Sequence, residues 1–150
     1  MSWKDLENAD PDLAAFGLSR FETRVAYLAT LRQDGSPRVH PVNPIVGQGH
    51  LFLFMEPTSP KGHDLRRDGR YALHAAVSDA NGTGGEFNLS GRAAFLTDPA
   101  LRALAAQLAS YTPAERYILF ELSVESAQST QYQNGEPVHR RWNRTGGAAG

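Results

Sequence analysis

The sequence predicts one domain of mixed α and β structure in which antiparallel strands dominate. Short apolar or alternating stretches follow one another in adjacent runs, separated by glycine-, asparagine- and aspartate-rich turn signals. Helix signals occur early, in the middle and late, without the strict alternation that a parallel sheet needs. The length of 150 residues and the hydrophobic fraction of 41% suit a single core. We therefore expect a mostly β (α+β) domain of about six strands over residues 1–144, and a flexible tail at 145–150.

Three expected helices begin with the same signal, a capping residue followed by proline. The three pairs are Asp10-Pro11, Ser59-Pro60 and Asp98-Pro99. The first helix is expected to end near Arg24 and the second near Asp68, and the third carries leucines along one face. A capping-box pattern at residues 112–115 predicts one further helical turn.

The expected strands lie between these helices and follow one another as hairpins. Residues 25–31 are apolar on both faces, and Asp34-Gly35 marks a tight turn after them. The next strand, residues 37–45, contains three prolines, which cannot donate to a ladder, so it should lie partly at a sheet edge or be bulged. The other expected strands cover residues 50–55, 70–78, 87–95, 118–124 and 128–133, with an Asn134-Gly135 turn before residues 139–144.

Charge and composition argue against several classes of protein. The formal net charge is −1 and no nucleic-acid-binding motif occurs, so nucleic acid is not an expected partner. Cysteine is absent, which removes disulfides and thiolate chemistry and fits a reducing compartment. The acidic N-terminus is not a signal peptide, the apolar runs are too short to span a bilayer, and the five histidines lack metal-site spacing. We expect a soluble, cytoplasmic protein without a membrane partner or a metal.

The most informative segment is Ser59-Pro60-Lys61. A helix N-terminus presents unpaired N–H groups and a partial positive charge, which together favour a phosphate. Lys61 lies in the first turn, where a cation opposes the helix dipole unless an anion sits between them. Arg38 and His40 share one strand face, and the arginine could reach the same phosphate. A plain helix cap with a solvated lysine, and an exposed strand arginine, remain the alternatives.

The order of these segments resembles the FMN-binding split-barrel family of pyridoxamine 5′-phosphate oxidase-like proteins. The resemblance covers residues 25–142 and rests on residues 25–31, 34–40, 51–55, 58–61 and 64–70. It implies an antiparallel split β-barrel that works as a homodimer with two cofactors at the interface. It also implies that Arg38, Ser59 and Lys61 hold the cofactor phosphate.

Further site residues follow from the resemblance alone. It places the backbone of four residues beside the flavin ring, namely Val39, His40, Pro41 and Val42. Met55 and Glu56, at the end of a strand, are expected to face the cofactor. Trp142 is similar in position to a late tryptophan that closes the site from the second subunit, and the alternative is simple packing of a C-terminal strand.

The resemblance implies an FMN-dependent oxidoreductase that acts on an unidentified small molecule. The flavin then supplies the hydride or electron chemistry, so no side chain is required as a nucleophile or general base. The chain is shorter than the true pyridoxamine-phosphate oxidases and lacks a complete set of matching pyridoxal-phosphate contacts, so that substrate is not expected. Two alternatives stay open: a reductase that holds the longer anionic deazaflavin coenzyme near Arg66 and Arg67, and a non-catalytic protein that sequesters flavin or haem.

Overall fold

A computed structural model describes residues 3–144, so the tail expected at 145–150 lies outside the described residues. The helices are α1 (Trp3–Ala9), α2 (Pro11–Arg20), α3 (Pro60–Arg67) and α4 (Pro99–Leu108), and a 3₁₀ turn covers Phe21–Thr23. The strands are β1 (Ala26–Leu31), β2 (Pro37–Val42), β3 (Ile45–Gly47), β4 (His50–Met55), β5 (Arg70–Ala75), β6 (Glu86–Leu96), β7 (Ile118–Leu122), β8 (Ser126–Gln133) and β9 (Glu136–Asn143). None of these helices is long and apolar enough to cross a membrane.

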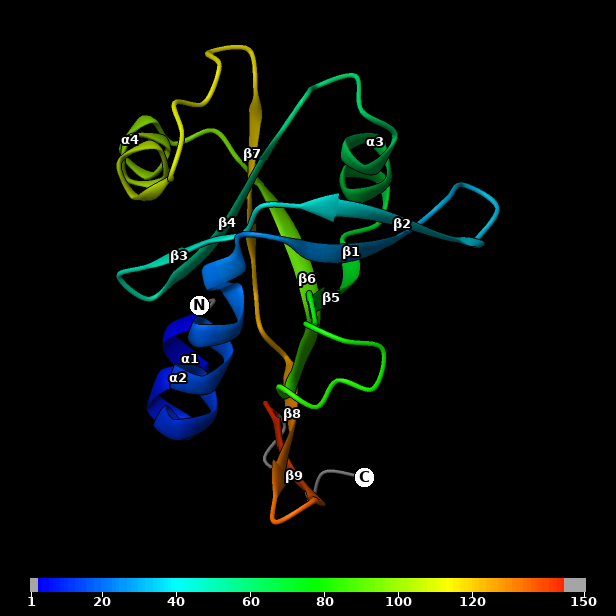
Figure 1. The fold of residues 1–150 in the computed structure, drawn as a ribbon. Coiled ribbons are helices and arrows are strands. Elements are labelled where there is room, and N and C mark those ends of the chain that lie inside the picture. Colours follow the sequence, from blue (N-terminus) through cyan, green and yellow to red (C-terminus); the bar gives the residue numbers. More distant parts are fainter. Residues whose placement is uncertain (1–2, 145–150) are drawn as a thin grey trace.

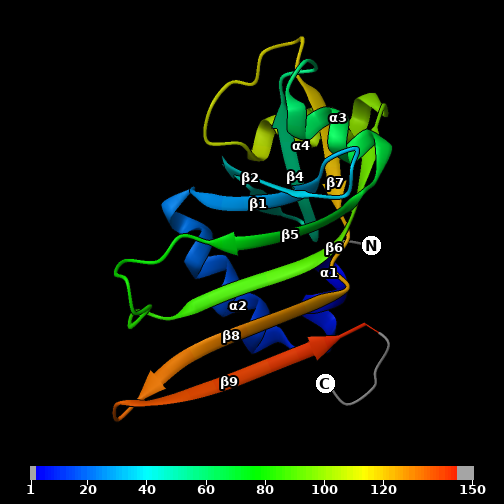
Figure 2. The same ribbon diagram turned by 90° about the vertical axis from the view of Figure 1, so that its right-hand side faces the viewer.

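All of these strands belong to one curled antiparallel sheet (Figure 1). Its order is β2-β1-β5-β6-β7-β4-β3, and β8 pairs with both β6 and β9. In the second view, β2, β1, β5, β6, β8 and β9 follow one another in a single layer (Figure 2). The other layer contains β7, β4 and β3. The predicted α+β fold and the predicted split β-barrel are confirmed.

The long strand β6 connects the two layers. Its residues 86–90 pair with β8, whereas its residues 93–96 pair with β7. The change of partner takes place beside Gly91, where an added Cβ atom would stand 2.0 Å from the carbonyl oxygen of Ser123. Only glycine allows this close approach of two backbones, so the residue is needed for the curl of the sheet.

Two hydrophobic clusters hold the helices against the sheet. In the larger one the rings of Trp3, Phe21 and Phe87 pack tilted or edge to face, with centroids 5.6–6.0 Å apart. This cluster anchors α1 and α2. The smaller cluster lies under α4 and consists of Ile45, Phe52, Ala105 and Leu119. The sequence analysis did not predict α1, because its buried residues, Trp3 and Leu6, precede the first capping signal.

Several predicted boundaries need correction. The expected strand 37–45 breaks at Asn43 and Pro44 into β2 and β3, although β2 does form a sheet edge as its prolines predicted. The first helix ends at Arg20, and the 3₁₀ turn that follows stops because Arg24 takes a left-handed φ of 61°. Residues 112–115 form no helical turn.

The C-terminal hairpin is longer than expected. Its strands β8 and β9 pair over their full lengths around Asn134 and Gly135, which take φ values of 53° and 79°. Two positive φ values in succession match the type I′ turn that an Asn-Gly pair favours. Together with the divided strand, this hairpin gives the described chain nine strands where about six were expected.

Candidate functional site

The helix α3 follows β4 after a short polar loop, and its N-terminus is the centre of the candidate site. Ser59 caps it, because the side-chain oxygen of Ser59 accepts a hydrogen bond of 3.2 Å from the backbone N–H of Gly62. Pro60 occupies the first helical position, as predicted. No acidic residue lies in the first turn, so nothing in this turn offsets the positive end of the helix dipole.

A buried carboxylate fixes α3 to the β1–β2 hairpin. Asp64 is 2% exposed, and its Oδ2 accepts hydrogen bonds from the Nε of Arg38 at 2.7 Å and the Oγ1 of Thr30 at 2.8 Å. Its Oδ1 accepts one of 3.0 Å from an Nη of Arg67. Burial alone would raise the pKa of Asp64, but these three donors outweigh it and hold the pKa below its ordinary value. Asp64 therefore stays ionised and orients Arg38.

Sequence reasoning missed Asp64, although one signal pointed toward it. Strand pairing places Thr30 directly opposite Arg38. Residues opposite each other in an antiparallel pair share a face, so both side chains extend toward the same point above the hairpin. The register follows from the turn at Asp34-Gly35, but the sequence did not show that α3 would cover that face.

Three basic side chains gather beside the cap of α3. The pKa of His40 lies below its ordinary value because of burial and of the nearby charges of Lys61 and Arg38. Burial lowers the pKa of Lys61, and within residues 3–144 its ammonium group has no hydrogen-bond or ion-pair partner. The terminal nitrogens of Arg38 likewise have no partner there, since only its Nε binds Asp64. This donor set fits a phosphate group.

A hollow of about 340 Å³ lies next to these cations. Its volume falls within the range of about 300–1,000 Å³ that is usual for small-molecule sites. Five residues expected at the cofactor line it: Pro41, Val42, Met55, Glu56 and Lys61. The other lining residues, which sequence reasoning missed, are Asn43, Phe54, Tyr111 and Tyr117.

Val39 and Trp142 lie away from this hollow, and Glu56 lines it but is already paired. Val39 is 63% exposed and lines another, smaller hollow, because alternate side chains on β2 point to opposite faces. Glu56 is held in an ion pair with Arg116, which lowers the pKa of Glu56. Trp142 lies on β9, where it is opposite Ala127 of β8 and packs against the larger hydrophobic cluster. Within one chain Trp142 is thus not brought to the cations.

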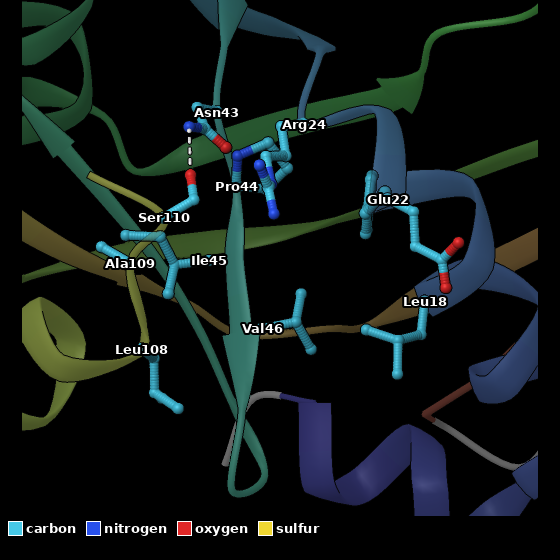
Figure 3. A pocket seen from close by; sticks show the side chains of 11 residues that line it. Leu18, Glu22, Arg24, Asn43, Pro44, Ile45, Val46, Leu108, Ala109 and Ser110 are labelled. Carbon is cyan, nitrogen blue, oxygen red and sulfur yellow. Dashed lines mark hydrogen bonds between the residues drawn. The ribbon is translucent and has the colours of Figure 1, made fainter.

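A larger hollow, of about 630 Å³, contains none of the expected site residues. It lies between the end of α2, β3 and the C-terminal end of α4 (Figure 3). Asn43 lines both this hollow and the smaller one, and its Nδ2 donates a hydrogen bond of 3.5 Å to the Oγ of Ser110. We place the cofactor site at the smaller hollow, because Lys61, which has no ion-pair partner within residues 3–144, lines it. Among the described residues, no cluster of three histidine, aspartate or glutamate side chains could hold a metal ion.

Residues 13–131 match the family described as pyridoxamine 5′-phosphate oxidase. The chain belongs to this family. The resemblance noted in the sequence is confirmed over most of its length, including both strands of the β1–β2 hairpin and all of α3. A comparison with curated proteins found no match.

Solved structures share the fold of this pyridoxamine 5′-phosphate oxidase family member. A heme binding protein from Mycobacterium smegmatis has a TM-score of 0.63 at 19% identity, over 80% of this chain and 52% of its own. The present chain therefore spans about half the length of that protein. A protein from Clostridium acetobutylicum, related to general stress protein 26 of Bacillus subtilis and to the pyridoxinephosphate oxidase family, has a TM-score of 0.65 at 13% identity, over 91% and 97% of the two chains.

Proposed function

We propose that the protein is an FMN-dependent oxidoreductase that acts on a small molecule. One observation carries the proposal: beside the N-terminus of α3 lie Lys61, which has no counterion within residues 3–144, and Arg38, whose terminal nitrogens stay free there while its Nε pairs with Asp64. A partly buried cation and a helix N-terminus both favour an anion, and a phosphate accepts hydrogen bonds from all three sources at once. Family membership supports a flavin phosphate as that anion.

The residues of the chain then bind and orient the cofactor. Lys61 and Arg38 hold the phosphate, and the hydroxyl of Ser59 can donate to it while still capping α3. Pro41, Val42 and Met55 line the hollow that would receive the flavin ring. FMN, when bound, supplies the hydride or electron chemistry. The residues that line the hollow would then hold the flavin ring in a fixed orientation.

We also propose a homodimer in the cytoplasm. Tyr27 and Val39 are 46% and 63% exposed on neighbouring strands, where they line a shallow hollow of about 250 Å³ with Ala29 and Ala72. Such apolar surface is typical of a face covered by a partner. A second copy would supply its Trp142 to the flavin. Light scattering of the FMN-loaded protein should give twice the chain mass, and FMN should quench a fluorescence component that Trp142→Phe removes. A monomer mass would reject the homodimer.

A haem-binding function is the second candidate. The heme binding protein from Mycobacterium smegmatis shares the fold, and the lowered pKa of His40 favours its neutral imidazole. A neutral imidazole can ligate the haem iron, and Lys61 and Arg38 could pair with the carboxylates of the haem. This candidate uses the same surface, so it competes directly with FMN.

Titration separates the candidates. The purified protein should bind FMN more tightly than riboflavin, which has the same ring without the phosphate. Equal affinity for the two would show that Lys61 and Arg38 do not bind a phosphate. A sharp haem absorption band that His40→Ala abolishes, together with no FMN binding, would favour the haem function. Tight binding of the deazaflavin coenzyme alone would favour the reductase that uses it.

A further inference from the structure

The larger hollow, of about 630 Å³, adjoins the proposed cofactor pocket. Asn43 lines both, and its side chain reaches across to Ser110 at the boundary (Figure 3). A molecule in the larger hollow would therefore lie one residue away from the flavin ring of the smaller one. Its volume of about 630 Å³ lies within the range of small-molecule sites.

Arg24 is the unusual residue of this hollow. Within residues 3–144, the side chain of Arg24 makes no hydrogen bond, ion pair, ring contact or other electrostatic contact. Every other arginine side chain in this range makes at least one. The side chain of Arg24 is exposed, lines the hollow and lies beside Pro44 in the view of Figure 3. An arginine facing a hollow without a partner is a ready site for a carboxylate.

The backbone conformation at Arg24 is unusual for an arginine. Its φ of 61° lies in the left-handed region, which favours glycine or asparagine over long side chains. The turn after the 3₁₀ segment would accept either of those residues at lower cost, so the turn alone does not account for an arginine. Strained residues of this kind cluster at ligand sites.

The other residues that line the hollow determine which kind of ligand body fits beside the carboxylate. Ile45, Val46 and Leu108 supply an apolar surface along β3 and the end of α4. Glu22 lies on the side of Leu18, away from Asn43 (Figure 3). A second negative charge on the ligand would face this glutamate, so the site favours a single acid group on an apolar body.

We propose that the larger hollow binds the substrate, a small monocarboxylic acid with an apolar body. The carboxylate pairs with Arg24, and the body lies against β3 and α4 and extends past Asn43 toward the cofactor. The role of this acid as the substrate rests on the proposed flavin function, whereas its binding at Arg24 does not need the flavin. Loss of FMN binding and loss of acid binding are therefore separate outcomes.

Calorimetric titration with phenylacetate and phenylacetamide tests the proposal, because the two probes differ only in the charged group. The FMN-loaded protein should bind the acid at least tenfold more tightly than the amide. Arg24→Gly should bring the ratio close to one, and Arg24→Lys should restore part of it. Arg24→Gly also suits the left-handed turn, so the variant is expected to fold.

A matched control is Arg92→Ala, which removes an exposed arginine of β6 that lies outside the hollow. It should leave the ratio unchanged. An unchanged ratio in Arg24→Gly, or no measurable binding of phenylacetate, benzoate or octanoate to the FMN-loaded parent, overturns the proposal. In the loaded protein phenylacetate should also shift the visible flavin band, and binding without that shift overturns its assignment as substrate. If the protein does not bind FMN but binding of the acid still requires Arg24, the acid site is supported and the flavin function is rejected.

Discussion

The helices α2, α3 and α4 begin with the same two-residue signal but differ in the charge at their N-termini. Asp10 caps α2 and Asp98 caps α4, and each carboxylate accepts a backbone N–H of its own helix. Ser59 caps α3 with a neutral hydroxyl, and Lys61 follows in the first turn. Two helices thus carry their own anion, whereas the third combines a helix N-terminus with cations.

The contrast shows how a common capping pattern can be turned into a binding site. A carboxylate cap satisfies both the hydrogen bond and the dipole, so nothing further is needed at α2 or α4. The serine cap satisfies only the hydrogen bond. The remaining positive potential at α3, increased by Arg38 and by a partly buried Lys61, is the physical basis for expecting an external phosphate there.

The largest loss of FMN affinity is expected when the serine cap of α3 is replaced by an aspartate, the cap of α2 and α4. Ser59→Asp preserves the cap and suits the helix dipole, so the free energy of unfolding should stay within about 0.5 kcal/mol of the parent. The new carboxylate would face the phosphate, and like charges in close contact cost several kcal/mol. FMN affinity should fall by more than about a hundredfold. The reverse change at α4, Asp98→Ser, is the control and should leave FMN binding unaltered.

Removing the cations should have the next largest effect. A charge-assisted hydrogen bond in a partly buried site contributes about 1.5–3 kcal/mol. Lys61→Ala and Arg38→Ala should therefore each weaken FMN binding by about tenfold to a hundredfold, as measured by fluorescence titration. Riboflavin binding should hardly change. If both variants bind FMN as the parent does, Ser59-Pro60-Lys61 is a simple helix cap like those of α2 and α4.

Asp64→Asn tests what holds Arg38 in place. The amide cannot accept from three donors as the carboxylate does, so the free energy of unfolding should fall by about 1–3 kcal/mol at neutral pH. Because the folded state lowers the pKa of Asp64 below 3.8, its contribution is present above that pH and disappears as the pH falls below it. Urea unfolding should thus show a smaller loss of stability from about pH 5 to about pH 3 in the variant than in the parent. Equal acid sensitivity would mean that other carboxylates dominate.

Local signals explain which parts of the structure could be predicted. Each helix that begins with a cap and a proline was found, because that pattern acts within one turn. Ser59 and Lys61 were candidates for the same reason. The break at Asn43-Pro44 was not predicted, since the prolines indicated an edge but not where the chain would change layers.

Features that depend on distant segments could not be read from the sequence. Asp64 meets Thr30 and Arg38 only because α3 packs over the β1–β2 hairpin. The larger hollow is built from residues 18–24, 43–46 and 108–110, three segments that no sequence pattern connects. Arg24 stands in a left-handed turn that the sequence analysis took for the end of a helix.

The smallest effect separates the two functions of Ser59. Ser59→Ala and Asp98→Ala each remove one N-cap, which costs about 1 kcal/mol of stability. Urea unfolding without cofactor should show similar losses for the two variants. Only Ser59→Ala should also weaken FMN, by up to about tenfold, because its hydroxyl can donate to the phosphate while Asp98 lies at the other helix. Equal losses of FMN affinity would attribute the effect to general destabilisation. An FMN loss confined to Ser59→Ala would show that a neutral cap leaves its helix free to bind the anion that Asp10 and Asp98 supply to theirs.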